Sequence, residues 1–188
     1  MKVKVGNIKL SRYILVLVFL LIALIPILIN CKGIKKVFYP IKYSSYVERY
    51  SIEYGVDKYL IYSIIKTESK FRTRAISYKN AKGLMQITDK TADWAKEELG
   101  LGNVDIYEPK ENIKIGVWYL SRLQREFNGN LKLVVASYNG GSGNVKKWLK
   151  SKDYSKDGRT LGNIPFEETS KYTDKVLYNY RIYRDLYK

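Results

Sequence analysis

The segment 57-DKYLIYSIIKTES-69 places a carboxylate inside an apolar helical stripe. Asp57 is suited to cap the first turn of a helix, because its side chain accepts hydrogen bonds from unpaired backbone N–H groups. At about 100° per residue, one face collects four aliphatic side chains, Leu60, Ile61, Ile64 and Ile65. Glu68 falls near the centre of that face. The pattern predicts a helix that directs an acid towards the core or a cleft wall.

The position of Glu68 against Ile64 and Ile65 predicts a raised pKa for its carboxyl group, because burial disfavours the charged form. A carboxyl group that keeps its proton near neutral pH is suited to general acid catalysis. The alternative is that the helix ends early and Glu68 faces water, as charged side chains usually do. This segment alone leaves both interpretations open.

Composition excludes several catalytic designs. The chain of 188 residues has no histidine and one cysteine, Cys31. Serine-histidine-acid triads, cysteine-histidine pairs and histidine zinc sites are therefore excluded, and no intramolecular disulfide can form. Proton transfer must use carboxylates, tyrosines, lysines or water. We expect no metal and no cofactor.

The net charge of +16 indicates an anionic partner or a need for solubility. Four basic residues and no acidic residue precede Cys31, so the rest of the chain carries +12. A cell-wall polymer, a membrane surface and nucleic acid all fit this charge. The basic residues are dispersed and no nucleic-acid motif accompanies them, which speaks against nucleic acid.

An uncharged run at residues 13–29 predicts a single membrane-spanning helix at the lower limit of length. No small residues precede a cleavage point, so an uncleaved anchor is favoured over a signal peptide. Asn30 stands where a lipoprotein signal prefers a small residue, which makes lipidation of Cys31 the weaker alternative. Basic residues flank both ends, so the charge rule favours a cytoplasmic N-terminus only weakly.

The remainder predicts one mainly α-helical domain. We divide the chain into a basic N-terminal segment (1–12), the membrane anchor (13–29), a basic linker (30–42) and a domain (43–188). Start and stop signals predict helices at 46–54, after Asp57, at 91–99, from Pro109 to about 128, and at 131–138, 145–150 and 168–187. Residues 151–163 form a polar loop suited to flank a groove.

Four motifs resemble, in order and spacing, the soluble lytic transglycosylase family, whose catalytic domain has a goose-type lysozyme-like fold. They are Glu68-Ser69, Gly83-Leu84-Met85-Gln86-Ile87, Tyr138-Asn139-Gly140-Gly141, and Glu168-Thr169 with Tyr172. Three departures are Thr88-Asp89, where methionine-proline often follows the glutamine motif, and Ser137 and Gly140, where alanine is common. The resemblance spans roughly residues 46–187.

The resemblance implies that Glu68 is the catalytic acid and that Ser69 supports it. The residues implied to bind the glycan are Ser69, Met85, Gln86, Tyr138, Asn139, Glu168 and Tyr172. The implied reaction cleaves the β-1,4 bond between N-acetylmuramic acid and N-acetylglucosamine without water and leaves 1,6-anhydro ends. Peptidoglycan strands would be the partner, and the domain would lie outside the cell membrane.

Only Glu68 lies in a motif with buried spacing, whereas a standard glycosidase uses two carboxylates. The lack of a second carboxylate in such a motif favours substrate-assisted transglycosylation over a lysozyme-type muramidase that uses water. A third possibility is a non-catalytic wall-binding protein that kept the groove.

Overall fold

The computed structural model describes residues 12–20, 22–23 and 32–188, and contacts divide the chain into residues 1–40 and 41–188. In the first unit, residues 12–20 and 22–23 are helical and helix α2 spans Lys32–Phe38, within the predicted linker. The predicted membrane segment, 13–29, includes positions 21 and 24–29, which lie outside the described residues. None of the described helices has the length and hydropathy to cross a membrane.

Residues 41–188 are mainly helical, as the sequence predicts. The helices are α3 (Ser44–Tyr54), α4 (Lys58–Glu68), α5 (Asp89–Leu99), α6 (Pro109–Glu126), α7 (Leu131–Gly140), α8 (Ser142–Lys150) and α9 (Glu167–Tyr187). Between α4 and α5 the chain forms a loop that contains two isolated β-bridges, from Lys82 to Ile76 and to Ile87. This loop carries the glycine-glutamine motif.

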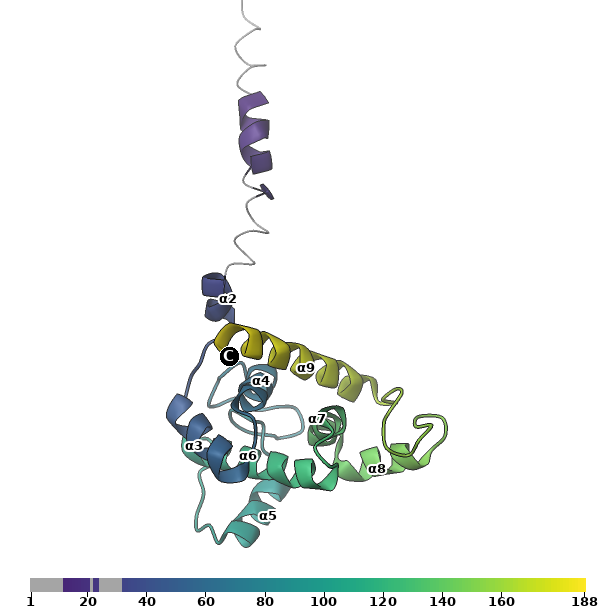
Figure 1. The fold of residues 1–188 in the computed structure, drawn as a ribbon. Helices are drawn as coiled ribbons and strands as arrows, with labels where there is room; N and C mark the ends of the chain where they lie inside the picture. The colour runs from purple at the N-terminus through teal and green to yellow at the C-terminus, as the bar shows by residue number, and fades with distance from the viewer. Residues whose placement is uncertain (1–11, 21, 24–31) are drawn as a thin grey trace, which may run out of the picture. The chain divides into compact units, whose positions relative to one another are not determined.

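Helices α4 and α7 lie between α9 and α6 (Figure 1). Contacts join α4 to α9, α7 to both α9 and α6, and α3 to α6. The four aliphatic residues of the α4 stripe are at most 1 % exposed, and they meet a core to which α9 contributes Val176 and Tyr183. The predicted apolar face of α4 is therefore confirmed, and the packing brings the C-terminal end of α4 against α9.

Local signals in the sequence explain where the helices begin and end. The Asp57 carboxylate accepts a hydrogen bond from the Tyr59 N–H at 2.8 Å, and the Thr88 hydroxyl accepts one from the Thr91 N–H at 3.2 Å. Gly55 and Gly100 end α3 and α5 with φ of 66° and 60°. Helix α4 thus starts directly after its predicted cap.

Helix α7 runs further than the sequence predicts. We expected it to end at Tyr138 and the following glycines to form a flexible turn, but the helix continues through Gly140. The chain changes direction only at Gly141, which has φ of 82°. The flexible-turn interpretation was wrong for Asn139 and Gly140, so Tyr138 and Asn139 project from a helix.

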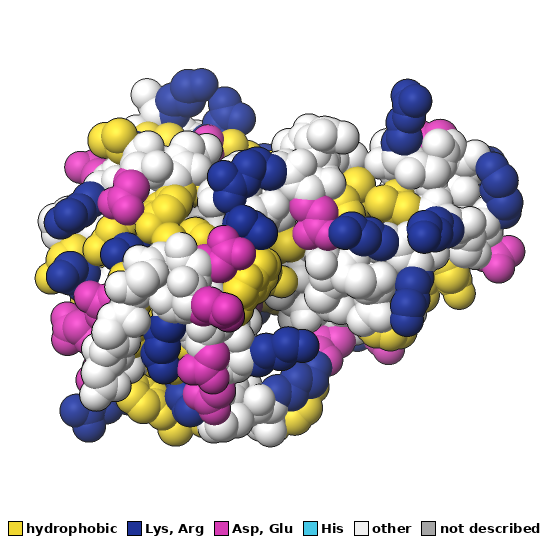
Figure 2. Space-filling view, turned by 90° about the horizontal axis from the view of Figure 1, so that it is seen from below, with side chains coloured by type: hydrophobic (Ala, Val, Ile, Leu, Met, Phe, Trp, Pro, Cys, Tyr) yellow, Lys and Arg dark blue, Asp and Glu magenta, His cyan; other side chains and the backbone are white. Residues whose placement is uncertain are grey.

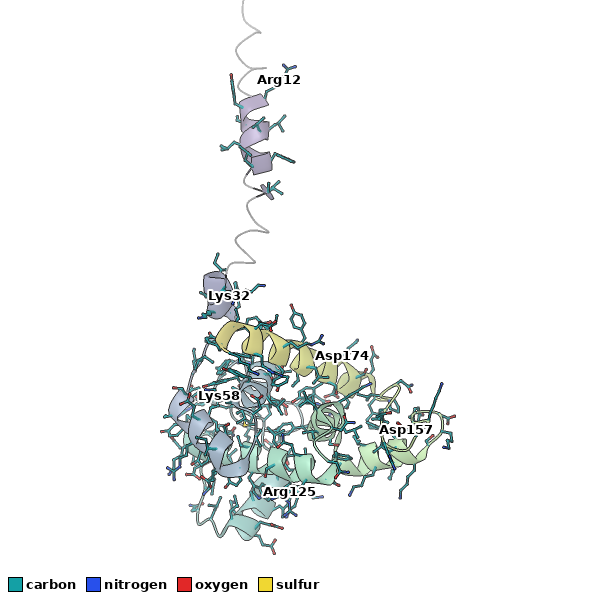
Figure 3. The ribbon with its side chains drawn as sticks, viewed as in Figure 1. Arg12, Lys32, Lys58, Arg125, Asp157 and Asp174 are labelled. Carbon is teal, nitrogen blue, oxygen red and sulfur yellow. The ribbon has the colours of Figure 1, made fainter. Side chains whose placement is uncertain are left out.

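The polar loop at residues 151–163 is organised around Asp157, which is labelled in Figure 3. Its carboxylate accepts hydrogen bonds from the N–H groups of Arg159 and Thr160, both at 2.8 Å. These bonds to the charged form hold the pKa of Asp157 well below its ordinary value. The loop therefore has a defined shape of its own.

Candidate active site

Glu68 is the last residue of α4, and its carboxyl group faces α9. The Tyr172 hydroxyl donates a hydrogen bond to Glu68 Oε1 at 2.8 Å. Glu68 is neither fully buried nor fully exposed, so one part of its side chain is enclosed by protein and another part is accessible. The sequence alternatives are resolved here: the helix ends at Glu68, but the side chain does not simply face water.

Burial raises the pKa of the Glu68 carboxyl from 4.5 to about 7. The Tyr172 hydrogen bond lowers this pKa, the nearby Glu168 charge raises it, and the Lys175 charge lowers it. Desolvation is the largest of these effects. The protonated and ionised forms of Glu68 are therefore both accessible near neutral pH, as a group that first gives and then takes a proton requires.

A hollow of about 160 Å³ opens in front of Glu68. Its walls come from the end of α4, the loop between α4 and α5, the end of α7 and the start of α9. The lining residues are Glu68, Ser77, Tyr78, Lys79, Ala81, Gln86, Thr88, Tyr138, Asn139 and Glu168. The structure thus brings Glu68, Gln86, Tyr138, Asn139 and Glu168 together, whereas no residue of the 151–163 loop lines this hollow.

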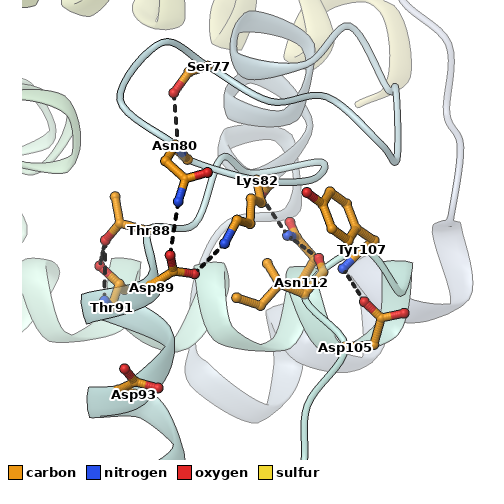
Figure 4. A network of polar contacts seen from close by, with 12 residues as sticks. Ser77, Asn80, Lys82, Thr88, Asp89, Thr91, Asp93, Asp105, Tyr107 and Asn112 are labelled. Carbon is orange, nitrogen blue, oxygen red and sulfur yellow. Dashed lines mark hydrogen bonds and ion pairs between the residues drawn. The ribbon is translucent and has the colours of Figure 1, made fainter.

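The loop that carries Gln86 is held by a polar network (Figure 4). Asp89 accepts hydrogen bonds from Lys82 Nζ at 2.6 Å and from Asn80 Nδ2 at 3.1 Å. The fully buried Asn112, on α6, accepts from the Met85 N–H at 2.7 Å and donates to the Lys82 carbonyl at 2.9 Å. The network fixes the backbone on either side of the glycine-glutamine motif.

The amide group of Gln86 makes hydrogen bonds within its own loop. Its Nε2 donates to the carbonyl oxygens of Ala75 at 3.1 Å and Gly83 at 2.9 Å. Gln86 itself has φ of 53°, a left-handed conformation that is uncommon outside glycine and asparagine. The surrounding hydrogen bonds therefore hold Gln86 against the hollow in one orientation.

Tyr138 and Asn139 are positioned by contacts that cross between elements. The Tyr138 hydroxyl donates to the Met85 carbonyl at 2.9 Å, which ties α7 to the loop. The Asn139 Oδ1 accepts from the Thr169 hydroxyl at 2.8 Å, which ties α7 to α9. Each of these side chains thus forms part of the wall of the hollow and part of its support.

Three of the predicted binding residues do not line the hollow: Tyr172, whose hydroxyl is directed at Glu68, and Ser69 and Met85, which lie behind the wall. Ser69 is fully buried, and its hydroxyl donates to the Ile65 carbonyl at 3.1 Å. Met85 is also fully buried, and a Cβ atom placed on Gly116 would lie 2.5 Å from its sulfur. Their side chains can hold Glu68 and the loop in place, but they offer no surface to a glycan.

Tyr78 and Lys79 belong to the hollow, although nothing in the sequence pattern pointed to them. Glu168 accepts hydrogen bonds from Lys79 Nζ at 3.0 Å and from the Tyr78 hydroxyl at 3.2 Å. These partners lower the pKa of Glu168, so it is ionised at neutral pH. A second carboxylate thus lines the hollow, and the sequence argument from a single carboxylate loses much of its force.

No cluster of three or more Cys, Asp or Glu residues suited to a metal ion occurs among the described residues. The residues that line the hollow offer proton transfer and hydrogen bonding: one carboxyl group with a pKa near neutrality, one ionised carboxylate, and amide and phenol groups around them. Such an arrangement can protonate a leaving oxygen.

The Transglycosylase SLT domain family matches residues 45–160, which hold the first three motifs. This chain belongs to that family. As an SLT domain, it has a mainly helical, lysozyme-like fold. It is 33 % identical over 136 residues to the membrane-bound lytic murein transglycosylase C of Sodalis glossinidius, an alignment that covers 66 % of this chain and 38 % of the relative.

Two solved structures resemble the SLT domain. An inactive Glu-to-Gln variant of the lytic transglycosylase Slt from Pseudomonas aeruginosa is 31 % identical with a TM-score of 0.71, covering 80 % of this chain and 25 % of the other. The 70 kDa soluble lytic transglycosylase of Escherichia coli is 28 % identical with a TM-score of 0.70, covering 78 % and 25 %. The alignments with the curated relatives cover well under half of each relative's length.

Proposed function

We propose that this chain is a peptidoglycan lytic transglycosylase. The observation that carries the proposal is the Glu68 carboxyl group, whose pKa of about 7 and hydrogen bond from Tyr172 suit an acid that later acts as a base. Membership of the SLT domain family and the names of the relatives support the same activity. The inactivity of a Glu-to-Gln variant in one relative supports an essential glutamate.

In the proposed reaction, protonated Glu68 gives its proton to the oxygen of the β-1,4 bond between N-acetylmuramic acid and N-acetylglucosamine. The acetamido group of the muramic acid stabilises the positive charge that develops at C1. The Glu68 carboxylate then removes the proton from the C6 hydroxyl of the same sugar. The C6 oxygen attacks C1 and closes a 1,6-anhydro ring, so no water is consumed.

The other lining residues would orient the glycan. Gln86, Tyr138, Asn139 and Glu168 border the hollow and present amide, phenol and carboxylate groups that suit sugar hydroxyls. Tyr172 would act on Glu68 instead, because its hydroxyl is already directed at the carboxyl group. Ser69 would keep its supporting role, and Met85, which was expected to line the groove, would instead support the loop from inside.

The second candidate function is a muramidase that uses water, which Glu168 in the hollow favours because a second ionised carboxylate is available to activate a water. Mass spectrometry of muropeptides released from purified peptidoglycan separates the two. We expect products that end in 1,6-anhydro sugars and are one water lighter than reducing-end products. Predominantly reducing ends would assign the chain to the muramidases instead.

We further propose that residues 13–29 anchor the domain to the cell membrane as a single span, with residues 43–188 outside the cytoplasm. The support is the uncharged apolar run and the membrane-bound relative. We expect the full chain to sediment with membranes and to need detergent for release. Quantitative recovery in the soluble fraction of lysed cells would contradict the anchor.

A further inference from the structure

Two hollows of about 480 and 470 Å³ adjoin each other between α8, the end of α6 and the 151–163 loop. Lys146, Leu149 and Gly158 line both of them, so the two form one continuous groove, which we call the basic groove. None of the residues that line it also lines the hollow of Glu68. The basic groove is therefore a separate candidate site.

The surface around the basic groove carries an excess of positive charge. Residues 146–159 hold six basic and two acidic side chains, a net charge of +4, which is almost half of the +9 carried by residues 41–188. Over the part of the surface that α8 and the 151–163 loop form, Lys and Arg side chains outnumber Asp and Glu side chains (Figure 2). The charge around the groove therefore favours an anionic ligand.

Helix α8 directs a row of side chains into the groove. Lys146, Leu149 and Lys150 stand at positions i, i+3 and i+4, which share one face of a helix. Another face is buried through Val145 and Trp148, which hold α8 in the fold. Lys146 and Lys150 are exposed. The helix thus presents charged groups to the groove from a fixed backbone.

The basic side chains of the groove differ in how far they are engaged. Lys146 forms an ion pair with Glu126, so these two charges offset each other. Lys152 Nζ donates to a backbone carbonyl at 3.2 Å, which leaves its charge uncompensated. The side chains of Lys150 and Arg159 are exposed and have no hydrogen bond or ion pair with any residue that the structure describes. Three cations are therefore available to a ligand.

Asp157 also lines the groove, but its carboxylate is engaged within the loop. Besides its two backbone donors, it accepts hydrogen bonds from the Thr160 hydroxyl at 2.8 Å and the Ser155 hydroxyl at 3.2 Å. Lys132 Nζ donates to the Leu161 carbonyl at 2.8 Å and ties the loop to α7. The loop therefore holds its basic side chains on a fixed frame, and Asp157 offsets one of the three free charges.

The residues of the groove favour phosphate over carboxylates and over nucleic acid. Three of its four basic residues are lysines, which bind phosphate as point charges, whereas the planar fork of arginine matches a carboxylate. Phe127 is the single aromatic residue among those that line the groove, and it is only 6 % exposed. Bases would find no ring on which to stack. A membrane surface is flat at this scale and would reach only the rim.

We propose that the basic groove binds a linear polymer of phosphodiester units that carries no bases. Two adjoining hollows suit an extended chain, along which Lys150, Lys152 and Arg159 would each pair with a phosphate group. The amide of Asn128 would donate to the oxygens between these charges. Binding here would hold the domain on an anionic polymer and leave the Glu68 hollow free. The inference does not depend on the reaction at Glu68, because it concerns a different set of residues.

The test measures the binding of fluorescent poly(glycerol phosphate) to the detergent-solubilised full chain, by fluorescence anisotropy at about 0.15 M salt. We expect the wild type to bind, and its affinity to fall as salt is added. A groove variant that combines Lys150→Ala, Lys152→Ala and Arg159→Ala should bind at least about tenfold more weakly, because three exposed charge pairs are lost. An unchanged thermal unfolding midpoint shows that this variant is folded.

The matched control combines Arg49→Ala, Lys90→Ala and Lys188→Ala. It removes the same charge from exposed residues that do not line the groove. We expect it to bind the polymer nearly as tightly as the wild type. An equal loss in both triple variants would mean that only net charge attracts the polymer and would overturn the proposal. So would a wild type that does not bind.

Two further probes separate the other anionic partners: oligothymidylate with the same number of phosphates, and vesicles that contain phosphatidylglycerol. We expect both to bind the wild type more weakly than poly(glycerol phosphate) does. Tighter binding of oligothymidylate would assign the groove to nucleic acid. If the groove variant loses vesicle binding but keeps polymer binding, the groove belongs to a membrane contact. Either result would overturn the proposal.

A rate measurement separates the basic groove from the site of Glu68. On purified peptidoglycan free of attached polymers, the groove variant should release muropeptides at the wild-type rate. A lower rate would make the groove part of the substrate site and overturn the proposal. If the proposed function itself is wrong, the wild type releases nothing, yet its binding of poly(glycerol phosphate) is unaffected.

Discussion

Replacing Glu68 by Gln is expected to reduce cleavage of purified peptidoglycan by roughly 10²- to 10⁴-fold, the usual contribution of a general acid. Gln keeps the size of the side chain and an oxygen that accepts the Tyr172 hydrogen bond. It can neither donate the proton nor take it back. The measurement is the initial rate of release of soluble muropeptides, and near-wild-type activity in Glu68→Gln would remove Glu68 from the mechanism.

The stability of Glu68→Gln at different pH values gives a separate check on the pKa of Glu68. The folded-state pKa of Glu68 is about 7 and its ordinary value is 4.5, so between these pH values the unfolded chain binds fewer protons than the folded one. The free energy of unfolding therefore falls as pH rises through that window and is constant above it. Glu68→Gln lacks this loss. Its stability relative to the wild type should increase from pH 4 to pH 8 by no more than about 3 kcal/mol, reduced by the partial exposure of the site.

The pH dependence of the wild-type rate gives a second check on Glu68. Because the acid must be protonated, kcat/KM should fall as pH rises through about 7. Tyr172→Phe removes a hydrogen bond that favours the charged form, so it should raise the pKa of Glu68 and move this falling limb to higher pH. If kcat/KM of Tyr172→Phe falls at the same pH as that of the wild type, Glu68 does not control this fall.

Gly83→Ala is expected to lower the free energy of unfolding by at least about 3 kcal/mol, because two separate costs add. Gly83 has φ of 79°, a conformation that disfavours any side chain. The new Cβ would also lie 2.2 Å from Asn112 Nδ2 and 2.8 Å from the Ile106 carbonyl oxygen. Asn112 would have to move, and moving it breaks part-buried hydrogen bonds to the Lys82 and Ile106 carbonyls.

Urea denaturation measures this effect, and Gly102→Ala is the matched control. A Cβ on Gly102 meets nothing within 4 Å, and its φ lies outside the positive range. The control should therefore change stability by less than about 0.5 kcal/mol. Equal midpoints for the two variants would refute the role that we assign to Gly83.

The helices were predictable because their signals are local. Asp57 precedes its helix by one residue, Gly55 and Gly100 stop helices at the positions where they stand, and the α4 stripe is visible within nine residues. The end of α7 was mispredicted for a related reason: Gly140 permits a turn but does not require one. Local preference decides an element only where tertiary contacts do not oppose it.

Much of the candidate site depends on contacts between distant residues, which no local signal contains. Lys79 belongs to the site because its ammonium group binds Glu168 of α9, which lies 89 positions later in the sequence. The family resemblance identified Met85 but not its orientation, since a motif records which residue is present and not which way it points. In the sequence Asn112 is one of several polar residues of α6, and only the structure joins it to the glycine-glutamine motif.

The hydrogen bond between Tyr172 and Glu68 joins residues 104 positions apart, and Tyr172 lies beyond the segment that matches the family. Helix α9 is therefore needed to complete the surroundings of the acid, although it follows every other helix in sequence. During synthesis the chain emerges from its N-terminus, so the hydrogen bond from Tyr172 to Glu68 cannot form before α9 has emerged and packed against α4. The Glu68 carboxyl group thus gains its phenol partner only after the other helices of residues 41–188 have been synthesised.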